Sequence, residues 1–230
     1  MTYSRFLVLA FVAVWIWAAI EPVSREDWLL ENFLVFLFLP LILLLGHYFE
    51  LSKVSYTLIA LFGVLHVIGS HYTYSLVPFG YMLERWFGAE RNMYDRMVHF
   101  AFGFLLAYPI REAFLRIAKV RGFWGYYLPL DVTLALSAVY EIVEWIVAAQ
   151  VDAKAGLAFL GSQGDVWDAQ KDMLLAGCGG LLTILGVAVF NFYYDGNFVR
   201  DLQQGFRLDK NDQPLGEISL RKLLTRHKQR

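Results

Sequence analysis

Cysteine is almost missing from this chain of 230 residues, which has Cys178 as its single example. One cysteine excludes a disulfide within these residues and a zinc site built from several thiolates. Charged residues are also scarce, at 18% of the chain. No phosphate-binding glycine loop, nucleophile elbow or nucleic-acid-binding motif occurs. We therefore expect neither a nucleotide-binding enzyme nor a protein that binds nucleic acid.

Apolar residues, in contrast to cysteine and charged residues, are abundant. The chain is 58% hydrophobic and 17% aromatic, and its mean hydropathy is +0.46. A soluble domain of this size is seldom so apolar, and a helix needs about 20 residues to cross the hydrocarbon core. We predict an all-α integral membrane protein with about six transmembrane helices, from six apolar segments near 5–20, 28–49, 54–69, 97–110, 128–149 and 173–192.

The distribution of basic residues predicts the orientation of these spans, because loops rich in Lys and Arg stay in the cytoplasm. With both termini inside, the inner side holds 14 of the 20 basic residues. The first apolar segment is expected to be retained as a helix, since no small-residue cleavage site follows it. We divide the chain into a membrane domain (1–197) and a basic cytoplasmic tail (198–230), in which "EISLRKLLTRHK" predicts a short amphipathic helix.

An acidic stretch, "GSQGDVWDAQKDM", stands directly before the last apolar segment. Its residues Asp165, Asp168 and Asp172 have the spacing i, i+3, i+7 and would share one face of a helix. Neighbouring carboxylates repel one another unless a cation, a proton or a basic partner lies among them. We therefore expect a compensating group at this place.

Other acidic residues and histidines fall at the same level of the predicted bundle. They belong to the stretches "GVLHVIGSH", "YDRMVHF" and "YEIVEW", and the proposed topology puts all of them in the outer half of the bilayer. Ionisable groups inside a membrane are costly unless paired, so such a cluster is a functional-site hypothesis. The candidate catalytic residues are Asp165, Asp168, Glu141 and His99, and the candidate binding residues are Glu144, Gln163, Asp172 and Trp167.

This combination of side chains suits a divalent metal such as zinc, manganese or magnesium. The candidate metal ligands are His66, His99, Asp165 and Asp168. Water activated at such a site can attack a lipid ester or phosphate at the membrane surface. No short ligand motif such as H-E-x-x-H supports this metal prediction.

Structural roles explain some of the same residues. Asp165 or Ser162 is suited to capping the last helix, and His66 to a hydrogen bond within the packed bundle. Glu141 is harder to explain in this way, because Glu144 lies one turn away and no basic residue shares their apolar segment. The glycines of the last apolar segment predict close helix contacts, at Gly177, Gly179, Gly180 and Gly186.

Three of these stretches, "RMVHFAFG", "YEIVEW" and "GSQGDVWDAQKDM", resemble the YjdF-type bacterial inner-membrane proteins, a domain family of unknown function. The resemblance covers roughly residues 60–192. It implies a protein of the bacterial plasma membrane but no activity, so the function is argued from the site. The "YE" helix, the acidic loop and the glycine-rich last helix are also similar to VanZ-like proteins over a shorter stretch.

Three functions are compatible with this sequence. The first is metal-assisted hydrolysis or transfer on a lipid or envelope precursor at an outward-facing site. The second is a small proton-coupled transporter in which Glu141 and Glu144 carry protons. The third is a non-catalytic membrane protein that binds lipid or a protein partner. Membrane lipids are the partners expected in each case, and the sequence names no protein partner.

Overall fold

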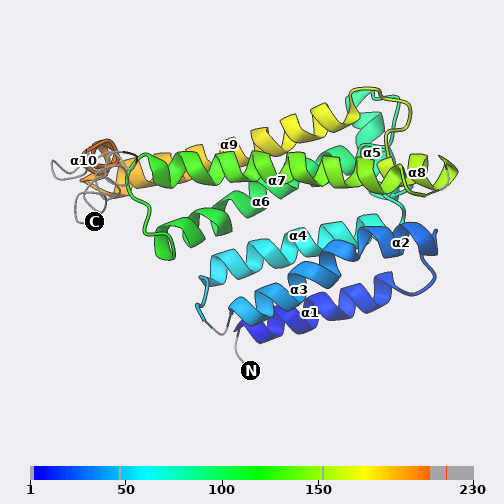
Figure 1. Cartoon of the computed structure of the whole chain (residues 1–230), viewed down its shortest axis with the longest axis horizontal. Coiled ribbons are helices and arrows are strands. Elements are labelled where there is room, and N and C mark those ends of the chain that lie inside the picture. Colours follow the sequence, from blue (N-terminus) through cyan, green and yellow to red (C-terminus); the bar gives the residue numbers. More distant parts are fainter. Residues whose placement is uncertain (1–2, 47, 152, 208–215, 217–230) are drawn as a thin grey trace, which may run out of the picture.

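The computed structural model describes residues 3–46, 48–151, 153–207 and 216. Every regular element within these ranges is an α-helix, as the all-α prediction requires (Figure 1). The helices are α1 (Tyr3–Ala18), α2 (Arg25–Glu31), α3 (Phe33–Leu45), α4 (Lys53–His71), α5 (Pro78–Phe87), α6 (Tyr94–Arg116), α7 (Trp124–Ala148), α8 (Ala153–Leu160), α9 (Asp168–Tyr194) and α10 (Phe198–Gln204).

Four stretches in the described part of the chain are long and apolar enough to cross a membrane. They are Arg25–Leu44, Lys53–His71, Tyr94–Arg116 and Asp168–Tyr194. Helix α1 is apolar but has only 16 residues. Helix α7 has 25 residues, but three acidic side chains interrupt its apolar sequence. Each predicted apolar segment therefore corresponds to a helix, while the number of six membrane crossings remains a prediction.

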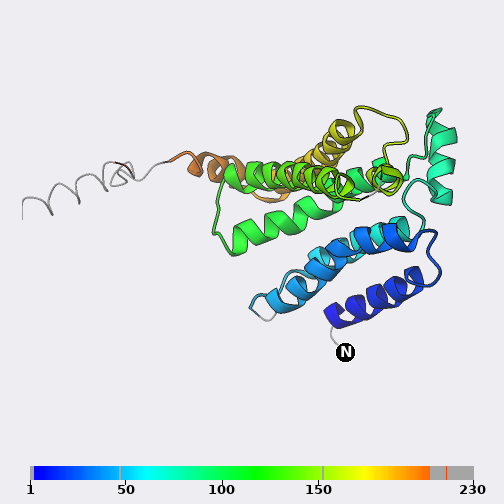
Figure 2. The same ribbon diagram turned by 45° about the vertical axis from the view of Figure 1, so that its right-hand side comes forward.

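The long helices form two groups. Helices α6, α7 and α9 form one group and pack on one another. Helices α1 to α4 form the other, which we call the N-terminal group, and its α4 packs both on α1 and on α6. The long helices alternate in direction along the chain (Figure 1). Helix α1 therefore starts on the same side of the bundle on which α9 ends and α10 lies (Figure 1). We call this the α10 end. The opposite end carries α2, α5 and α8, and we call it the α5 end (Figure 2).

A buried amide holds the N-terminal group together at the break between α2 and α3. Asn32 is fully buried, and its Oδ1 accepts a hydrogen bond from Trp15 Nε1 at 2.6 Å. Its Nδ2 donates to Ser70 Oγ at 3.0 Å and to the Trp28 carbonyl at 2.7 Å. Because an unpaired polar group in an apolar layer is costly, these bonds fix α1, α2 and α4 relative to one another.

A second polar contact joins the N-terminal group to α6 at the α10 end. The Glu112 carboxylate accepts hydrogen bonds from the main-chain N–H of Ser52 at 2.8 Å, from Ser52 Oγ at 2.7 Å and from Ser55 Oγ at 2.5 Å. A carboxylate at the N-terminus of α4 satisfies its free N–H groups and the helix dipole. The α10 end therefore has its own point of attachment, separate from the α5 end.

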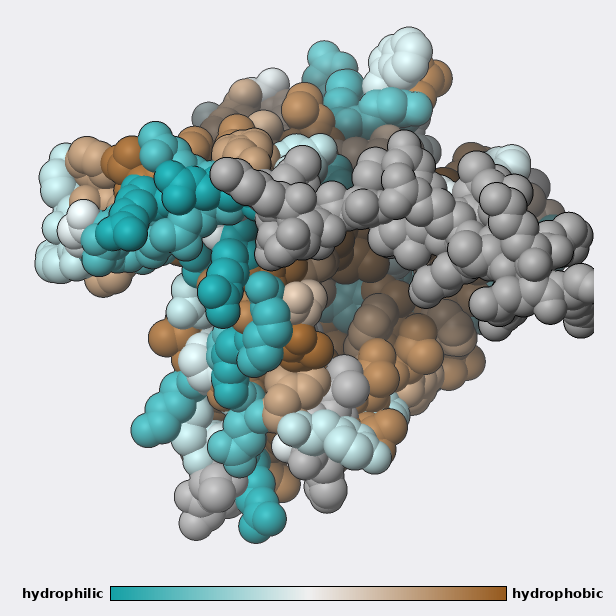
Figure 3. Space-filling model, turned by 60° about the vertical axis from the view of Figure 1, so that its left-hand side comes forward, coloured by the Kyte–Doolittle hydropathy of each residue, from teal (hydrophilic) through white to brown (hydrophobic). Residues whose placement is uncertain are grey.

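Hydrophilic residues gather at the α10 end in a band, with hydrophobic residues on either side of it (Figure 3). Helix α10 packs on α9 there, and the Trp124 indole donates to the Gly205 carbonyl at 2.8 Å. The amphipathic helix predicted within 217–228 lies outside the described residues. The division at residue 198 therefore stays a prediction.

Glycines allow α6 and α9 to approach at main-chain distance. A Cβ atom on Gly179 would lie 2.1 Å from the Phe100 carbonyl oxygen, and one on Gly103 would lie 1.8 Å from the Ala176 carbonyl oxygen. A Cβ on Gly177 or Gly180 would meet side chains of α7, whereas one on Gly186 would meet nothing within 4 Å. Close contacts therefore occur at three of the four glycines predicted for this role.

Gly179→Ala is expected to lower the thermal stability of the detergent-solubilised protein. The added methyl group must displace the main chain of α6, and such overpacking costs about 1–3 kcal/mol. The matched variant Gly186→Ala adds the same methyl group in open space, where helix propensity favours alanine. Thermal unfolding followed by circular dichroism measures both. Equal transition temperatures for the two variants would contradict this account of the α6–α9 contact.

Candidate functional site

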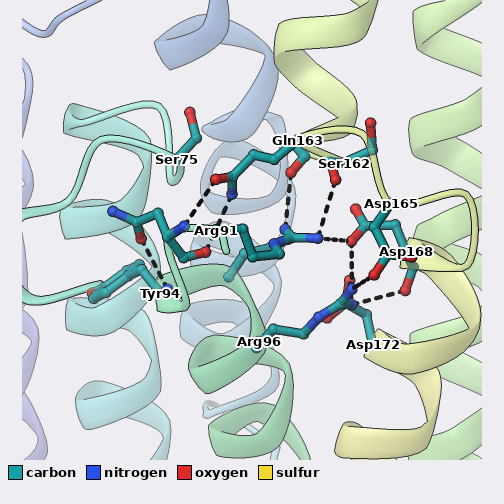
Figure 4. A network of polar contacts seen from close by, with 12 residues as sticks. Ser75, Arg91, Tyr94, Arg96, Ser162, Gln163, Asp165, Asp168 and Asp172 are labelled. Atoms are coloured by element: carbon teal, nitrogen blue, oxygen red, sulfur yellow. Dashed lines mark hydrogen bonds and ion pairs between the residues drawn. The ribbon is translucent and has the colours of Figure 1, made fainter. Parts of the chain in front are cut away.

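Two arginines of α6 and the turn before it compensate the aspartates of the acidic stretch. Arg96 Nη2 lies 3.0 Å from Asp165 Oδ2 and 2.7 Å from Asp168 Oδ1. Arg96 Nη1 lies 2.5 Å from Asp172 Oδ2, and Arg91 forms an ion pair with Asp168. Figure 4 shows both guanidinium groups between α6 and the start of α9. We call Arg91, Arg96, Asp165, Asp168 and Asp172 the arginine network.

Arg91 also binds the main chain of the acidic loop. Its guanidinium donates to the carbonyls of Gly161 at 3.0 Å and Ser162 at 3.2 Å, and it lies 3.7 Å from Asp95 Oδ2. The two carbonyls and the Asp168 carboxylate accept hydrogen bonds from the Arg91 guanidinium, whose N–H donors have a fixed planar arrangement. The loop between α8 and α9 is therefore held against the first turn of α6.

Gln163 makes a second contact between this loop and the start of α6. Its Oε1 accepts from the Asn92 N–H at 2.9 Å, and its Nε2 donates to the Asn92 carbonyl at 3.2 Å. Gln163 has a positive φ of 47°, a conformation that costs an ordinary residue energy and persists only where the surroundings enforce it. The side chain of Gln163 thus serves to position the loop.

Asp165 and α9 are arranged differently from the sequence prediction. Helix α9 begins at Asp168 with Trp167 at its cap position, so neither Ser162 nor Asp165 is the N-cap. Asp165 precedes the helix, accepts from the Trp167 N–H at 3.0 Å and pairs with Lys171 at 2.6 Å. The hydrogen bond from Lys171, followed by that from Trp167, lowers the pKa of Asp165 from its usual value.

A second cluster lies beside the arginine network and joins α6 to α7. His99 Nε2 lies 3.5 Å from Asp95 Oδ1 and 3.6 Å from Glu141 Oε1. Glu144 lies one turn further along α7 and is buried. We call Asp95, His99, Glu141 and Glu144 the carboxyl–histidine cluster. It brings together three of the predicted site residues.

The carboxyl–histidine cluster continues into the N-terminal group of helices. The Tyr140 hydroxyl donates a hydrogen bond to Glu31 Oε2 at 3.1 Å. His66 Nε2 lies 3.1 Å from the Glu31 carbonyl, and His66 Nδ1 lies 2.6 Å from the Tyr74 hydroxyl. Burial raises the pKa of Tyr74, which lies in the loop between α4 and α5, well above its usual value.

A cleft of about 1030 Å³ runs between the two groups of helices. Apolar side chains of α1, α3, α4, α6 and α7 line most of it, including Leu7, Phe38, Ile59, Leu106 and Val139. At the α5 end its lining becomes polar, with Glu31, His66, Tyr74, Asp95, His99 and Glu144. The volume is at the upper end of the range for small-molecule pockets, about 300–1,000 Å³. The site is therefore the polar end of a hydrocarbon-lined cleft.

The predicted site residues fall into three places. Asp165, Asp168, Asp172 and Gln163 belong to the acidic loop or the first turns of α9 and hold or adjoin the arginine network. His99, Glu141 and Glu144 belong to the carboxyl–histidine cluster. His66 binds Tyr74 and the Glu31 main chain, while the Trp167 side chain is 62% exposed. The roles assigned to these residues remain predictions.

The comparison with known proteins identifies the family. The family described as "Predicted membrane protein (DUF2238)" matches residues 3–192. The chain belongs to this family. The inner membrane protein YjdF of Escherichia coli (strain K12) is 36% identical over 184 residues, which are 80% of this chain and 88% of that protein. No solved structure matches the chain. The resemblance to YjdF-type proteins is thus confirmed, and the chain is a multi-pass helical membrane protein.

Sequence reasoning missed several residues of this DUF2238-family site. The sequence suggests local pairing of Arg91 and Arg96 with Glu90 and Asp95, whereas in the structure both arginines bind aspartates of the acidic stretch; two arginines at the start of a span opposite three aspartates are a signal for such ion pairs. Glu31 was overlooked because it stands near the start of a predicted span. No local pattern relates it to Tyr140, which is 109 residues away.

Arg96→Gln is expected to destabilise the fold strongly. Arg96 has a side chain only 6% exposed and contacts three carboxylates, so its removal leaves buried charge without a partner, at a cost of about 3–5 kcal/mol. Chemical or thermal unfolding in detergent measures the loss. The double variant Arg96→Gln, Asp172→Asn is expected to recover part of it, because the two groups act as a pair.

Arg85→Gln serves as the matched control, since Arg85 is an exposed residue of α5 at the same end of the bundle. Its stability is expected to equal that of the wild type. If Arg96→Gln unfolds at the same temperature as Arg85→Gln, the arginine network does not hold the site together.

Proposed function

We propose that this protein binds a membrane lipid or a lipid-linked envelope precursor in the cleft and carries out hydrolysis or group transfer on its polar head. The proposal rests on one observation, the continuity between an apolar cleft of about 1030 Å³ and a buried cluster of carboxyl and imidazole groups at its end. An amphiphile has the same division, with a hydrocarbon tail next to a polar head.

The apolar part of the cleft fits hydrocarbon better than water. Its lining includes Leu7, Phe38, Ile59 and Leu106, and apolar cavities stay dry or take up apolar molecules. A lipid tail in this position would replace contacts with the surrounding bilayer at little cost, because the two environments are similar. The polar end then receives the head group without exposing it to hydrocarbon.

The carboxyl–histidine cluster supplies groups for acid and base chemistry. His99 lies 3.6 Å from Glu141, an imidazole and a carboxyl group on facing helices. Such a pair can take a proton from water and return it to a leaving oxygen, which contributes about 10²–10⁴-fold to a rate. Asp165 and Asp168, which the sequence also proposes as catalytic, are engaged with Arg96. We therefore assign the proton transfers to His99 and Glu141.

We further propose that the protein lies in the bacterial inner membrane with the α5 end facing outward. The relative YjdF is named an inner membrane protein, which supports this location. The excess of basic residues in the tail and in the predicted inner loops supports the orientation. The substrate would then be reached from the outer leaflet or from the space outside the membrane.

A transport function finds less support. The middle of the cleft is lined by apolar residues such as Leu7 and Ile42, which separate the polar groups of the α5 end from Arg5 and Glu50 at the α10 end. A path for protons or ions needs water or polar groups across the whole membrane. A non-catalytic lipid-binding protein would use the same cleft, and only the measurement of turnover separates it from an enzyme.

Val139→Trp is expected to reduce the amount of lipid that stays bound to the purified protein. Val139 lines the cleft and is 55% exposed in the protein alone. An indole at this position would occupy the volume that we propose for a lipid tail. Native mass spectrometry counts the bound lipids. Val189→Trp is the matched control, because Val189 of α9 is 54% exposed but does not line the cleft. Equal lipid content in the two variants would contradict the proposed binding site.

Turnover is tested with the wild-type protein in vesicles that contain phosphatidylethanolamine, phosphatidylglycerol and an isoprenoid phosphate. Release of fatty acid or phosphate, or formation of a new lipid, is followed by mass spectrometry. His99→Gln and Glu141→Gln are expected to keep lipid binding and to lower the rate by about 10²–10⁴-fold. Lipid binding without turnover in the wild type would favour the lipid-binding function, and proton uptake coupled to solute movement would favour transport.

A further inference from the structure

We propose that Asp95, His99 and Asp172 form a binding site for a divalent transition-metal ion, zinc or manganese, at the polar end of the cleft. One donor atom from each residue lies within 4.8 Å of the other two. The three residues come from two helices that glycines hold at main-chain distance, so their relative positions are fixed by the tightest contact of the bundle.

The distance between the Asp95 and His99 donor atoms fits a shared metal better than a hydrogen bond. His99 Nε2 is 3.5 Å from Asp95 Oδ1, which is long for a hydrogen bond to a carboxylate. A tetrahedral ion with bonds of about 2.0–2.2 Å separates its ligand atoms by roughly 3.3–3.6 Å. Asp95 and His99 are four residues apart on α6, a spacing that puts both donors on one face.

Buried oxygen atoms without partners supply the independent evidence. Asp172 is 1% exposed, and while its Oδ2 binds Arg96, its Oδ1 has no hydrogen-bond partner. Glu141 Oε1, which is 3.6 Å from His99 Nε2, also lacks one. Buried carboxylate oxygens are seldom left unpaired. A metal ion beside His99 would satisfy the free oxygen of Asp172 and attract that of Glu141.

The charges around the site leave room for a cation. Asp95, Asp165, Asp168 and Asp172 are paired with Arg91, Arg96 and Lys171, one base fewer than the acids. In the described part of the chain, neither Glu141 nor Glu144 has a Lys or Arg partner. Negative charge is therefore in excess at this end of the bundle, and a divalent ion would reduce it.

The donor set indicates which metals fit. One imidazole with carboxylate oxygens suits zinc and manganese, while magnesium and calcium prefer oxygen ligands alone. Arg96 binds Asp172 through Oδ2 and leaves Oδ1 without a partner, as second-shell partners that orient metal ligands do. Three protein ligands leave a coordination position for water or for a head group, the arrangement of catalytic zinc sites.

This ligand set differs from the one that the sequence predicts. It shares His99 with that set but replaces His66, Asp165 and Asp168. His66 is engaged with Tyr74 and the Glu31 carbonyl, and Asp165 and Asp168 are bound by Arg96. The two sets can be separated by mutation, because each contains residues absent from the other.

The test is metal binding by the full-length protein in detergent. The protein is stripped with a chelator and titrated with zinc chloride and with manganese chloride in a calorimeter, and its metal content is checked by plasma mass spectrometry. The wild type is expected to bind one ion. Asp95→Asn and Asp172→Asn are each expected to weaken binding by roughly 100-fold or more, since even second-shell changes cost about 10–100-fold.

Two variants serve as controls. Asp165→Asn removes one negative charge beside the same Arg96, and His66→Gln removes an imidazole that lines the same cleft; both are expected to bind the metal as the wild type does. Absence of binding by the wild type would overturn the proposal. It would also be overturned by equal losses in Asp165→Asn and Asp172→Asn, or by unchanged binding in both Asp95→Asn and Asp172→Asn.

Cobalt substitution gives a readout that does not depend on a ligand variant that folds poorly. Cobalt in a four-coordinate site of the wild type is expected to give an intense visible absorption band that zinc removes. Absence of any cobalt absorption that zinc removes would contradict the site. Metal binding is measured without added lipid, and lipid binding is measured with the chelator present, so failure of the metal site is distinguishable from failure of the proposed function.

Discussion

The ion pairs of Arg91 and Arg96 with the acidic loop are the interaction on which the rest of the α5 end depends. Both guanidinium groups are nearly buried, at 11% and 6% side-chain exposure, and they hold the loop between α8 and α9 on the first turn of α6. A buried arginine without carboxylates would be costly, and so would the carboxylates without arginine. Each group is therefore retained by the other, and together they set the distance between α6 and α9.

This arrangement gives the neighbouring carboxyl–histidine cluster a fixed place. Asp95 and His99 lie on α6 within a turn of Arg96, and Asp172 lies one turn along α9 from Asp168. The arginines neutralise part of the acidic charge but leave oxygens of Asp172 and Glu141 unpaired. The site thus combines a neutralised part that holds the structure together and a part with unpaired oxygens beside Asp95 and His99, which line the cleft. An unsatisfied buried group is expected where a protein binds something.

The cleft connects this chemistry to the membrane. Its apolar part lies between the N-terminal helices and the α6–α7 pair, although α4 also packs directly on α6. Polar contacts join the two groups at both ends, through Glu112 at the α10 end and through Glu31 and Tyr140 at the α5 end. A lipid held between them would contact both groups along its length. The lipid-binding and catalytic proposals therefore depend on the same separation of the helices.

Much of the fold was predictable from local patterns. Runs of apolar residues near 20 in length identify helices because a bilayer leaves no other way to satisfy the main chain, and all six predicted segments are helical. The bias of basic residues predicts both termini in the cytoplasm, and this orientation stays a prediction. The glycines of α9 indicated a close contact, which occurs with α6.

The sequence by itself determined the family, the helices and the concentration of acidic residues and histidines at one level of the bundle. Only the tertiary structure decided which charges meet. Spacing along a helix says which side chains share a face, but the partner of that face comes from a distant segment, as Arg96 does for Asp165 and Tyr140 for Glu31. For this reason the sequence predicts metal ligands at Asp165 and Asp168, whereas in the fold these two carboxylates bind arginine. The unpaired oxygens belong to Asp172 and Glu141.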